Sequence, residues 1–296
     1  MEFEIWFKEK VQTVENALNI YFEKHDNKQR IIYDAMEYSL FAGGKRLRPV
    51  LMLSVYEMFK EINDTVLAFS CAMEMIHTYS LIHDDLPAMD DDDYRRGRLS
   101  NHKKFGEATA ILAGDGLLNM AFETMLKESI KSQISKNVLL ECMLKIATSS
   151  GSEGMIGGQV VDMFSTENTK TTEDLEYLQN RKTGAIIKSS CVVGAMLAGA
   201  TEKEIEAIEV FAEKIGLAFQ VKDDILDVEG NEEKLGKPIG SDKEKDKVTY
   251  VTILGLEKSK ELLGKLTDEA IESIASFGER ANMLIELAKY LIIREN

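Results

Sequence analysis

The scarcity of proline limits the possible folds of this chain more than any other feature of its sequence. Only Pro49, Pro87 and Pro238 occur among 296 residues, and proline is the residue that a helix interior tolerates least. Long helices are therefore permitted almost everywhere. Apolar residues also recur at helical spacing from the start of the chain, at Trp6, Phe7, Val11, Val14, Leu18 and Phe22. Because strand-like alternation between tight turns is missing, the sequence predicts an all-α protein.

The same spacing predicts a series of further helices. Their expected ranges are 29–42, 48–60, 64–86, 107–129, 136–149, 173–199, 202–228, 249–264 and 268–294, the last broken near Gly278. Capping residues are expected at Asn63 and Asp64, at Thr172 with Asp174, and at Thr201 with Glu204. No Gly/Ser linker or change of composition divides the chain, so we expect one domain over residues 1–296, built as a helical bundle.

Composition argues against several classes of function. Lys and Arg number 36 and Asp and Glu 51, a net charge of −15 that should repel nucleic acid and anionic membranes. The acidic first ten residues do not resemble a signal peptide, and the stretch 185–200 is too short and polar for a membrane span. We therefore expect a cytoplasmic protein. The three widely spaced cysteines, Cys71, Cys142 and Cys191, are expected to be buried free thiols.

A strongly acidic segment follows the apolar run that ends near residue 83. It contains Asp84, Asp85, Asp90, Asp91, Asp92 and Asp93. These charges repel one another unless water or a cation neutralises them, and Mg²⁺ is the natural oxygen-seeking cation. Pro87 should turn the backbone and could bring Asp90 back toward Asp84. A solvated acidic loop is the alternative interpretation.

A second acidic cluster, Asp223, Asp224 and Asp227, lies far away in sequence. Asp223 and Asp227 are four residues apart, hence about 6 Å apart along one face of a helix. Apolar neighbours on both sides favour a pocket over a solvated face. Two such clusters facing each other across a cavity could hold more than one Mg²⁺. An EF-hand pattern cannot be placed over residues 84–101.

Each proline lies in a charged, glycine-bearing loop, and basic residues accompany all three. The basic residues are Lys45, Arg46 and Arg48 beside Gly43 and Gly44; Arg95, Arg96 and Arg98 beside Gly97; and Lys237 beside Gly236. Arginine forks suit phosphate oxygens, and glycine lets backbone amides approach, so a diphosphate site is favoured over solvated patches. His77 lies two helical turns before Asp84 and could reach a phosphate or be a core histidine. The spacing is not that of a P-loop.

These motifs together resemble the trans-prenyltransferase (polyprenyl synthase) family, in particular its bacterial farnesyl diphosphate synthases. The resemblance rests on G-G-K-R-L-R-P at 43–49, I-H-T-Y-S-L-I-H-D-D-L-P-A-M-D-D-D-D at 76–93, R-R-G at 95–97, F-G-E-A-T-A-I-L-A-G-D at 105–115, G-G-Q at 157–159, K-T-G at 182–184, F-Q-V-K-D-D-I-L-D at 219–227 and L-G-K at 235–237. One departure is visible: the family usually has Pro-Thr where this chain has Leu99 and Ser100.

The resemblance implies a helical bundle around a deep central cavity, usually dimeric, that condenses an allylic diphosphate with isopentenyl diphosphate. It implies two or three Mg²⁺ ions, with Mn²⁺ a possible substitute, bound by Asp84, Asp90 and Asp223 with Asp85, Asp224 and Asp227 as partners. Isopentenyl diphosphate would be held by Lys45, Arg48, His77 and Arg96. The allylic substrate would be held by Arg95, Lys182, Thr183, Gln220 and Lys237, of which Lys182, Thr183 and Gln220 are expected to be catalytic.

Product length is expected to depend on Tyr79 and Ser80, which precede Asp84 by five and four residues. A ring at position 79 would lie below the metal site and stop a growing chain, which in bacterial relatives goes with a fifteen-carbon product. Tyr79 could instead be a simple core residue. The alternatives to a farnesyl diphosphate synthase are a geranylgeranyl diphosphate synthase, a non-catalytic subunit and a terpene cyclase. Asp91 to Asp93 receive no role.

Overall fold

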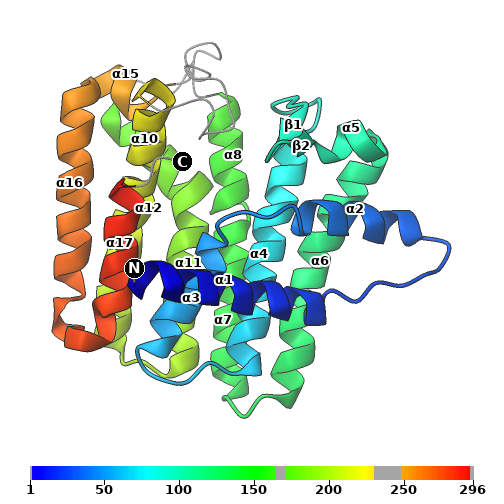
Figure 1. Ribbon diagram of the computed structural model, residues 1–296, viewed down its shortest axis with the longest axis horizontal. Helices are drawn as coiled ribbons and strands as arrows, with labels where there is room; N and C mark the ends of the chain where they lie inside the picture. Colours follow the sequence, from blue (N-terminus) through cyan, green and yellow to red (C-terminus); the bar gives the residue numbers. More distant parts are fainter. Residues whose placement is uncertain (1, 165–170, 230–247, 294–296) are drawn as a thin grey trace. The chain divides into compact units, whose positions relative to one another are not determined.

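The computed structural model describes residues 2–164, 171–229 and 248–293, and most of them are helical (Figure 1). The predicted all-α class is thus confirmed. The chain forms two compact units. The first consists of Met1–Leu53 and Glu61–Met143, and the second of Ser54–Lys60 and Leu144–Asn296.

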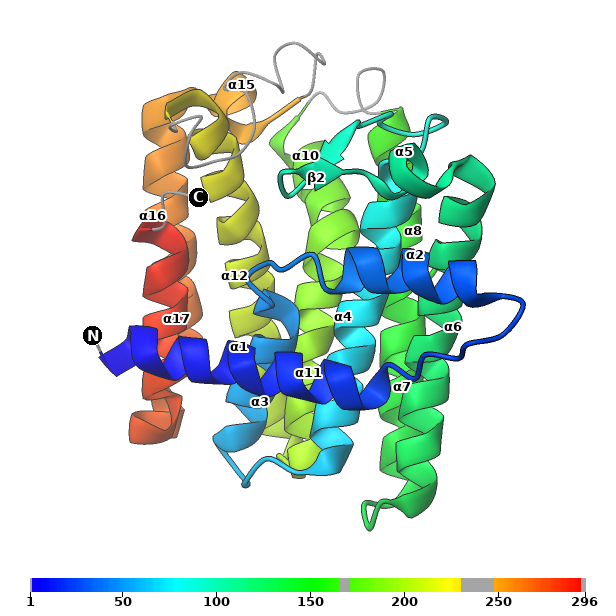
Figure 2. The ribbon, with the colours of Figure 1, turned by 45° about the vertical axis from the view of Figure 1, so that its right-hand side comes forward.

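The first unit is organised around two long neighbouring helices, α4 and α6. Its elements are α1 (Glu2–Tyr21), α2 (Arg30–Leu40), most of α3 (Leu47–Glu57), α4 (Asp64–Asp84), β1 (Tyr94–Arg95), β2 (Arg98–Leu99), α5 (Asn101–Phe105), α6 (Glu107–Lys131) and the first half of α7 (Lys136–Ser150). Helices α4 and α6 lie side by side, and the β1–β2 hairpin and α5 lie where α4 ends and α6 begins (Figures 1 and 2). Small residues on α6, including Ala110, Ala113 and Gly114, are fully or nearly fully buried and permit this close approach.

Helix α4 begins and is buried as its sequence predicts. Asn63 caps it by accepting a hydrogen bond from the Val66 amide at 3.1 Å. By length and composition α4 is apolar enough to cross a membrane, alone among the described helices, but 78% of its most apolar stretch is buried inside the protein. Such burial is typical of a core helix in a globular protein.

The second unit has its core between α12 and the helices that follow it. Its elements include α8 (Met155–Met163), α10 (Thr172–Gln179), the π-helix η1 (Asn180–Gly184), α11 (Ala185–Ala198), α12 (Glu202–Glu229), α15 (Tyr250–Leu254), α16 (Leu256–Ser273), the 3₁₀-helix η2 (Ala275–Ala281) and α17 (Asn282–Ile293). One apolar cluster joins α10, α12, α15 and α16, with Leu178, Val221 and Tyr250 almost fully buried in it. This core fixes the helix that carries the second acidic cluster.

Several predicted boundaries are wrong, and glycine explains some of the differences. Gly255, with φ of 81°, ends α15 early, and α16 then runs through the gap expected after residue 264. The range 173–199 is not one α-helix, because η1 interrupts it. Its cap is Thr171 rather than Thr172, although Asp174 completes the capping box as expected. The break near Gly278 is confirmed, with φ of 58°.

The sequence pattern missed the shortest elements. Helices α5 and α8 and the β1–β2 hairpin were not predicted, since each has fewer than ten residues and gives little periodicity. The cysteine prediction is confirmed: Cys71, Cys142 and Cys191 are buried free thiols. Burial raises the pKa of the Cys142 and Cys191 thiols to about 12, so neither is a reactive thiolate at neutral pH.

Candidate active site

The acidic segment at the end of α4 folds back on itself. Helix α4 ends at Asp84, and after the turn at Pro87 the Asp90 amide donates to the Asp84 carbonyl at 2.9 Å. The predicted return of Asp90 toward Asp84 is therefore confirmed. Both side chains are half-buried. The fold thus brings together the backbones of two aspartates that are six residues apart.

Asp85 lies differently from its neighbours, since its side chain is almost fully buried and paired with Arg95. The Arg95 Nε donates to both carboxylate oxygens at 2.9 and 3.2 Å, and its Nη2 donates to Oδ1. Burial raises the pKa of the Asp85 carboxyl, an effect that Arg95 only partly offsets. Asp85 therefore anchors an arginine in this structure rather than pointing outward with Asp84.

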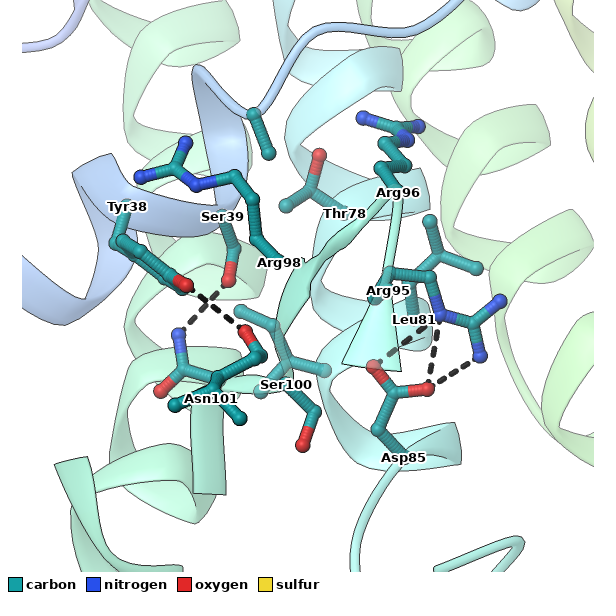
Figure 3. A pocket seen from close by; sticks show the side chains of 13 residues that line it. Tyr38, Ser39, Thr78, Leu81, Asp85, Arg95, Arg96, Arg98, Ser100 and Asn101 are labelled. Atoms are coloured by element: carbon teal, nitrogen blue, oxygen red, sulfur yellow. Dashed lines mark hydrogen bonds and ion pairs between the residues drawn. The ribbon is translucent and has the colours of Figure 1, made fainter. Parts of the chain in front are cut away.

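The two adjacent arginines of the β1–β2 hairpin point in opposite directions (Figure 3). Arg96 and Gly97 both have positive φ, 53° and 71°, as in the tight turns that suit hairpins. Arg95 turns toward Asp85, whereas Arg96 donates to the Gly43 carbonyl. A Cβ on Gly44 would lie 2.7 Å from the Arg96 guanidinium carbon, so any other residue at position 44 would displace the guanidinium from this place.

The neighbouring G-G-K-R loop contains one arginine that does not belong to a ligand site. Arg46 is buried, and its guanidinium donates to Glu15 and Glu74 at 2.6 Å each and to the Leu40 carbonyl at 2.7 Å. Counting Arg46 in the basic patch was wrong, because two carboxylates already neutralise it. Its contacts instead fix the loop that carries Lys45 and Arg48.

His77 lies next to this basic group as a neutral imidazole. The Arg48 Nη1 and the His77 Nε2 are 3.3 Å apart. Burial, followed by the charges of Arg48 and Arg96, holds the pKa of His77 well below its usual range. A neutral ring can accept the Arg48 N–H and thereby orient the guanidinium. Lys45, Arg48, His77 and Arg96 all belong to the first unit.

Tyr79 and Ser80 occupy the helix turn before the acidic segment. Tyr79 is 5% exposed, its ring packs edge-on against His83 with centroids 5.7 Å apart, and burial raises its pKa to about 12. The Ser80 hydroxyl donates to the His77 carbonyl at 2.8 Å. A packed ring at position 79 is compatible with both roles considered for Tyr79, a residue that limits product length and a simple core residue.

In the second unit, α12 presents Asp223, Asp224 and Asp227 in two different ways. Asp223 and Asp227 are half-buried. Asp224 is almost fully buried and accepts hydrogen bonds from the Tyr250 amide at 2.8 Å and the Gln220 Nε2 at 3.3 Å. Asp224 therefore holds the start of α15 in this structure, and its carboxylate is already engaged.

The π-helix η1 brings the other predicted residues of this unit together. The Thr183 hydroxyl donates to the Gln220 Oε1 at 3.4 Å, and the Lys182 Nζ lies 2.5 Å from the Asp162 Oδ2. A Cβ on Gly158 would lie 2.3 Å from the Lys182 nitrogen, so the G-G-Q motif allows η1 to approach α8. Such π-turns are frequent at functional sites.

Sequence reasoning missed Asp162, the partner of Lys182. It follows Gly158 by one helical turn, so the spacing from the G-G-Q motif was the available signal. Lys237, predicted to hold the allylic substrate, lies outside the described residues.

The four half-buried carboxylates of the two clusters suit Mg²⁺. Among the described residues no three His, Cys, Asp or Glu side chains converge into a complete cage. Mg²⁺ does not need one, because it keeps several waters and is usually bound by one or two carboxylates and substrate phosphates. The hard oxygen donors of Asp84 and Asp90, and of Asp223 and Asp227, fit this requirement.

Comparison with known proteins identifies the family of this chain. The model of the polyprenyl synthetase family matches residues 29–286. The chain belongs to the polyprenyl synthetase family. Among its relatives, the farnesyl diphosphate synthase of Bacillus subtilis is 44% identical over 96% of this chain and 96% of its own length. The chloroplastic geranylgeranyl pyrophosphate synthase of Capsicum annuum is 45% identical over 99% of this chain and 79% of its own.

Solved structures of polyprenyl synthetases share the fold. A crystal structure of an FPP/GFPP synthase from Zymomonas mobilis matches with a TM-score of 0.87 and 32% identity, over 98% of this chain and 99% of that one. A geranyltransferase from Legionella pneumophila matches with a TM-score of 0.87 and 31% identity, over 100% of this chain and 98% of that one. The chain is thus a prenyltransferase with the isoprenoid synthase fold.

Proposed function

We propose that this prenyltransferase condenses isopentenyl diphosphate with dimethylallyl or geranyl diphosphate to give farnesyl diphosphate. The observation that carries the proposal is the way in which the charged side chains that follow α4 are paired. Asp85 is buried against Arg95, which leaves Asp84 and Asp90 together at the bend and Arg96 beside the glycine loop. The carboxylates of this short segment and the Arg96 guanidinium would therefore meet different ligands.

The basic corner of the first unit would bind isopentenyl diphosphate. Arg96 is held at Gly43, Arg48 is oriented by neutral His77, and Lys45 lies between Gly43 and Arg48 in sequence. The carboxylates of Glu15 and Glu74 are both engaged by Arg46. Arg46 is thereby occupied, and Lys45, Arg48 and Arg96 are the cations that would meet phosphate oxygens.

The acidic groups would bind the allylic diphosphate through metal. Asp84, Asp90, Asp223 and Asp227 would hold two or three Mg²⁺ ions, or Mn²⁺, which when bound neutralise the departing diphosphate. Asp85 and Asp224 would support these carboxylates indirectly. Asp85 accepts hydrogen bonds from Arg95, and Asp224 accepts one from Gln220. Lys182, Arg95 and Lys237 would add positive charge around the same diphosphate.

The hydrogen-bond chain of the second unit would face the allylic carbocation. The Thr183 hydroxyl donates a hydrogen bond to the Gln220 Oε1, and the Gln220 Nε2 donates one to the Asp224 Oδ1. The lone pairs of the Thr183 oxygen are thereby turned away from Gln220 and can stabilise positive charge. The double bond of isopentenyl diphosphate would attack the cation and the departing diphosphate would take the final proton, so neither a protein nucleophile nor a protein base is needed.

Product length and assembly are further parts of the proposal. The buried ring of Tyr79 favours a fifteen-carbon product, with geranylgeranyl diphosphate as the alternative that the Capsicum relative represents. Exposed apolar residues on α6, Leu112, Leu126 and Ile130, favour a homodimer. One domain over residues 1–296 and a cytoplasmic location complete the proposal.

One assay tests the activity. The purified protein is incubated with Mg²⁺, isopentenyl diphosphate and either dimethylallyl or geranyl diphosphate, and the carbon number of the product is measured. We expect farnesyl diphosphate from both starters. A twenty-carbon main product would replace the assigned product by geranylgeranyl diphosphate, and the absence of condensation with either starter would overturn the proposal.

A further inference from the structure

Helix α2 holds the exit of the β1–β2 hairpin at two nearby points. The Tyr38 hydroxyl donates to the Leu99 carbonyl at 2.9 Å (Figure 3). The Asn101 Nδ2 donates to the Ala35 carbonyl and to the Ser39 hydroxyl, both at 2.8 Å. Leu99 ends β2 and Asn101 begins α5, so the chain is fixed on both sides of Ser100.

The Tyr38 ring strengthens the same connection. The Arg98 guanidinium lies 4.2 Å from the ring centroid and the Lys104 ammonium 4.3 Å from it. The Phe105 ring meets Tyr38 edge-on, with centroids 5.4 Å apart. One tyrosine of α2 therefore contacts both β2 and α5.

The hairpin needs this support. Each strand has two residues, and Tyr94 and Leu99 are exposed, so little apolar burial stabilises it. Its turn places Arg96 at φ of 53°, a region uncommon for residues other than glycine. A turn of this kind persists only when the surrounding structure holds it.

Helix α4 gives the hairpin exit less direct support. A cavity of about 30 Å³ is lined by Thr78 of α4, by Arg96 and Arg98 of the hairpin, and by Asn101. The Thr78 Oγ1 and the Asn101 Oδ1 are buried and have no hydrogen-bond partner among the described residues. The hydrogen bonds that fix Leu99 and Asn101 instead go to α2.

We propose that Tyr38 and Asn101 are positioning residues for the two substrate-binding arginines. By holding the hairpin exit they keep Arg96 over Gly43 and Gly44, and Arg95 against Asp85. The inference rests on the proposed function, in which Arg96 binds isopentenyl diphosphate. Loss of the hold should weaken binding of that substrate more than it slows the chemical step.

Tyr38→Phe tests the inference, because it removes one hydroxyl and keeps the ring. We expect the KM for isopentenyl diphosphate to rise about threefold to tenfold, the range for one lost hydrogen bond, with kcat within about twofold of wild type. Tyr33→Phe, on the same helix but against His25, should leave both constants unchanged. An unchanged KM in Tyr38→Phe would overturn the proposal.

A double-mutant comparison separates positioning from a general structural effect. If Tyr38 acts through Arg96, the rise in KM caused by Tyr38→Phe should disappear when Arg96→Ala is already present. Asn101→Ala, checked for helix content by circular dichroism, should behave in the same way. Equal rises in both backgrounds would overturn the inference. An Arg96→Ala enzyme with an unchanged KM would instead contradict the proposed function.

Discussion

The two acidic clusters share one arrangement and differ in what completes it. At the end of α4, Asp84 is half-buried and Asp85 is buried; on α12, Asp223 is half-buried and Asp224 is buried. Asp85 is paired with the Arg95 guanidinium, whereas Asp224 accepts from a backbone amide and a neutral side-chain amide. In each unit, the second aspartate connects the acidic cluster to the surrounding structure.

The difference in partners indicates a difference in role. Arg95 is a proposed ligand of the allylic diphosphate, so Asp85 would link the proposed metal site to substrate binding. The Tyr250 amide belongs to the first turn of α15, so Asp224 would link the proposed metal site to the fold of the second unit. Substitutions at the two positions should therefore affect different measurements, and substitutions of the half-buried aspartates should affect the same one.

The largest effect is expected from Asp84→Ala and Asp223→Ala. Each would remove a carboxylate that holds metal against the departing diphosphate, so kcat should fall by about a hundredfold to a thousandfold or more. Helix content, measured by circular dichroism, should stay as in wild type because both side chains lie at the edge of their cores.

Asp93→Asn is the matched control for those two variants. Asp93 is exposed and pairs with Lys103 at 2.7 Å, away from the carboxylates assigned to metal. Its kcat should stay within about twofold of wild type, since exposed ion pairs contribute little. Near-normal turnover in Asp223→Ala would show that the second cluster is only a solvated face.

Tyr79→Ala should change the product rather than the rate. The Tyr79 ring, in the first unit, is the proposed limit on product length. Without that ring, the variant should make products longer than fifteen carbons when it is supplied with Mg²⁺ and both substrates. Tyr79→Phe keeps the ring and should keep the fifteen-carbon product. Chromatography of the dephosphorylated products gives the measurement, and a fifteen-carbon product from Tyr79→Ala would assign Tyr79 to the core.

The sequence was enough to identify the two acidic clusters as candidate sites. It did not show which residues inside the protein would contact the charged side chains of these sites. Proline and periodicity were enough to place most of the long helices, including α4, α6 and α12, and Pro87 was enough to predict the return of Asp90. The π-turn at η1 was not predictable, because it depends on the close approach of Gly158 to Lys182 from another helix. Arg46 looked like a phosphate ligand because Glu15 and Glu74 lie 31 and 28 residues away in sequence.

Asp85→Asn and Asp224→Asn should separate the two buried aspartates. Asp85→Asn loses a charge-assisted pair, so the free energy of unfolding should fall by about 1.5–3 kcal/mol and the KM for the allylic substrate should rise. Asparagine at position 224 can still accept the hydrogen bond from the Tyr250 amide, so the free energy of unfolding should change by no more than about 0.5–1.5 kcal/mol. Urea denaturation and steady-state kinetics give both values, and equal losses at the two positions would contradict the difference in roles.

The smallest expected effect is a change in the pH dependence of stability at His77. The pKa of His77 in the folded protein is well below that of an ordinary histidine, because of burial and the nearby arginines. As pH falls below about 6.5, the unfolded chain binds a proton at His77 that the folded chain does not bind. The stabilisation is therefore present at neutral pH and is lost toward acid, with a slope of at most about 1.4 kcal/mol per pH unit.

His77→Gln should remove that slope, because glutamine does not titrate and its side-chain oxygen can still accept from Arg48. Urea denaturation at pH 7.5, 6.5 and 5.5 measures the difference between the two proteins. His25, His83 and His102 are present in both, so their contributions cancel. The curves should converge toward acid pH, since wild type alone loses the His77 contribution. Parallel curves would mean that His77 binds its proton equally well in the folded and unfolded protein, and Arg48 would then need another partner to orient it at acid pH.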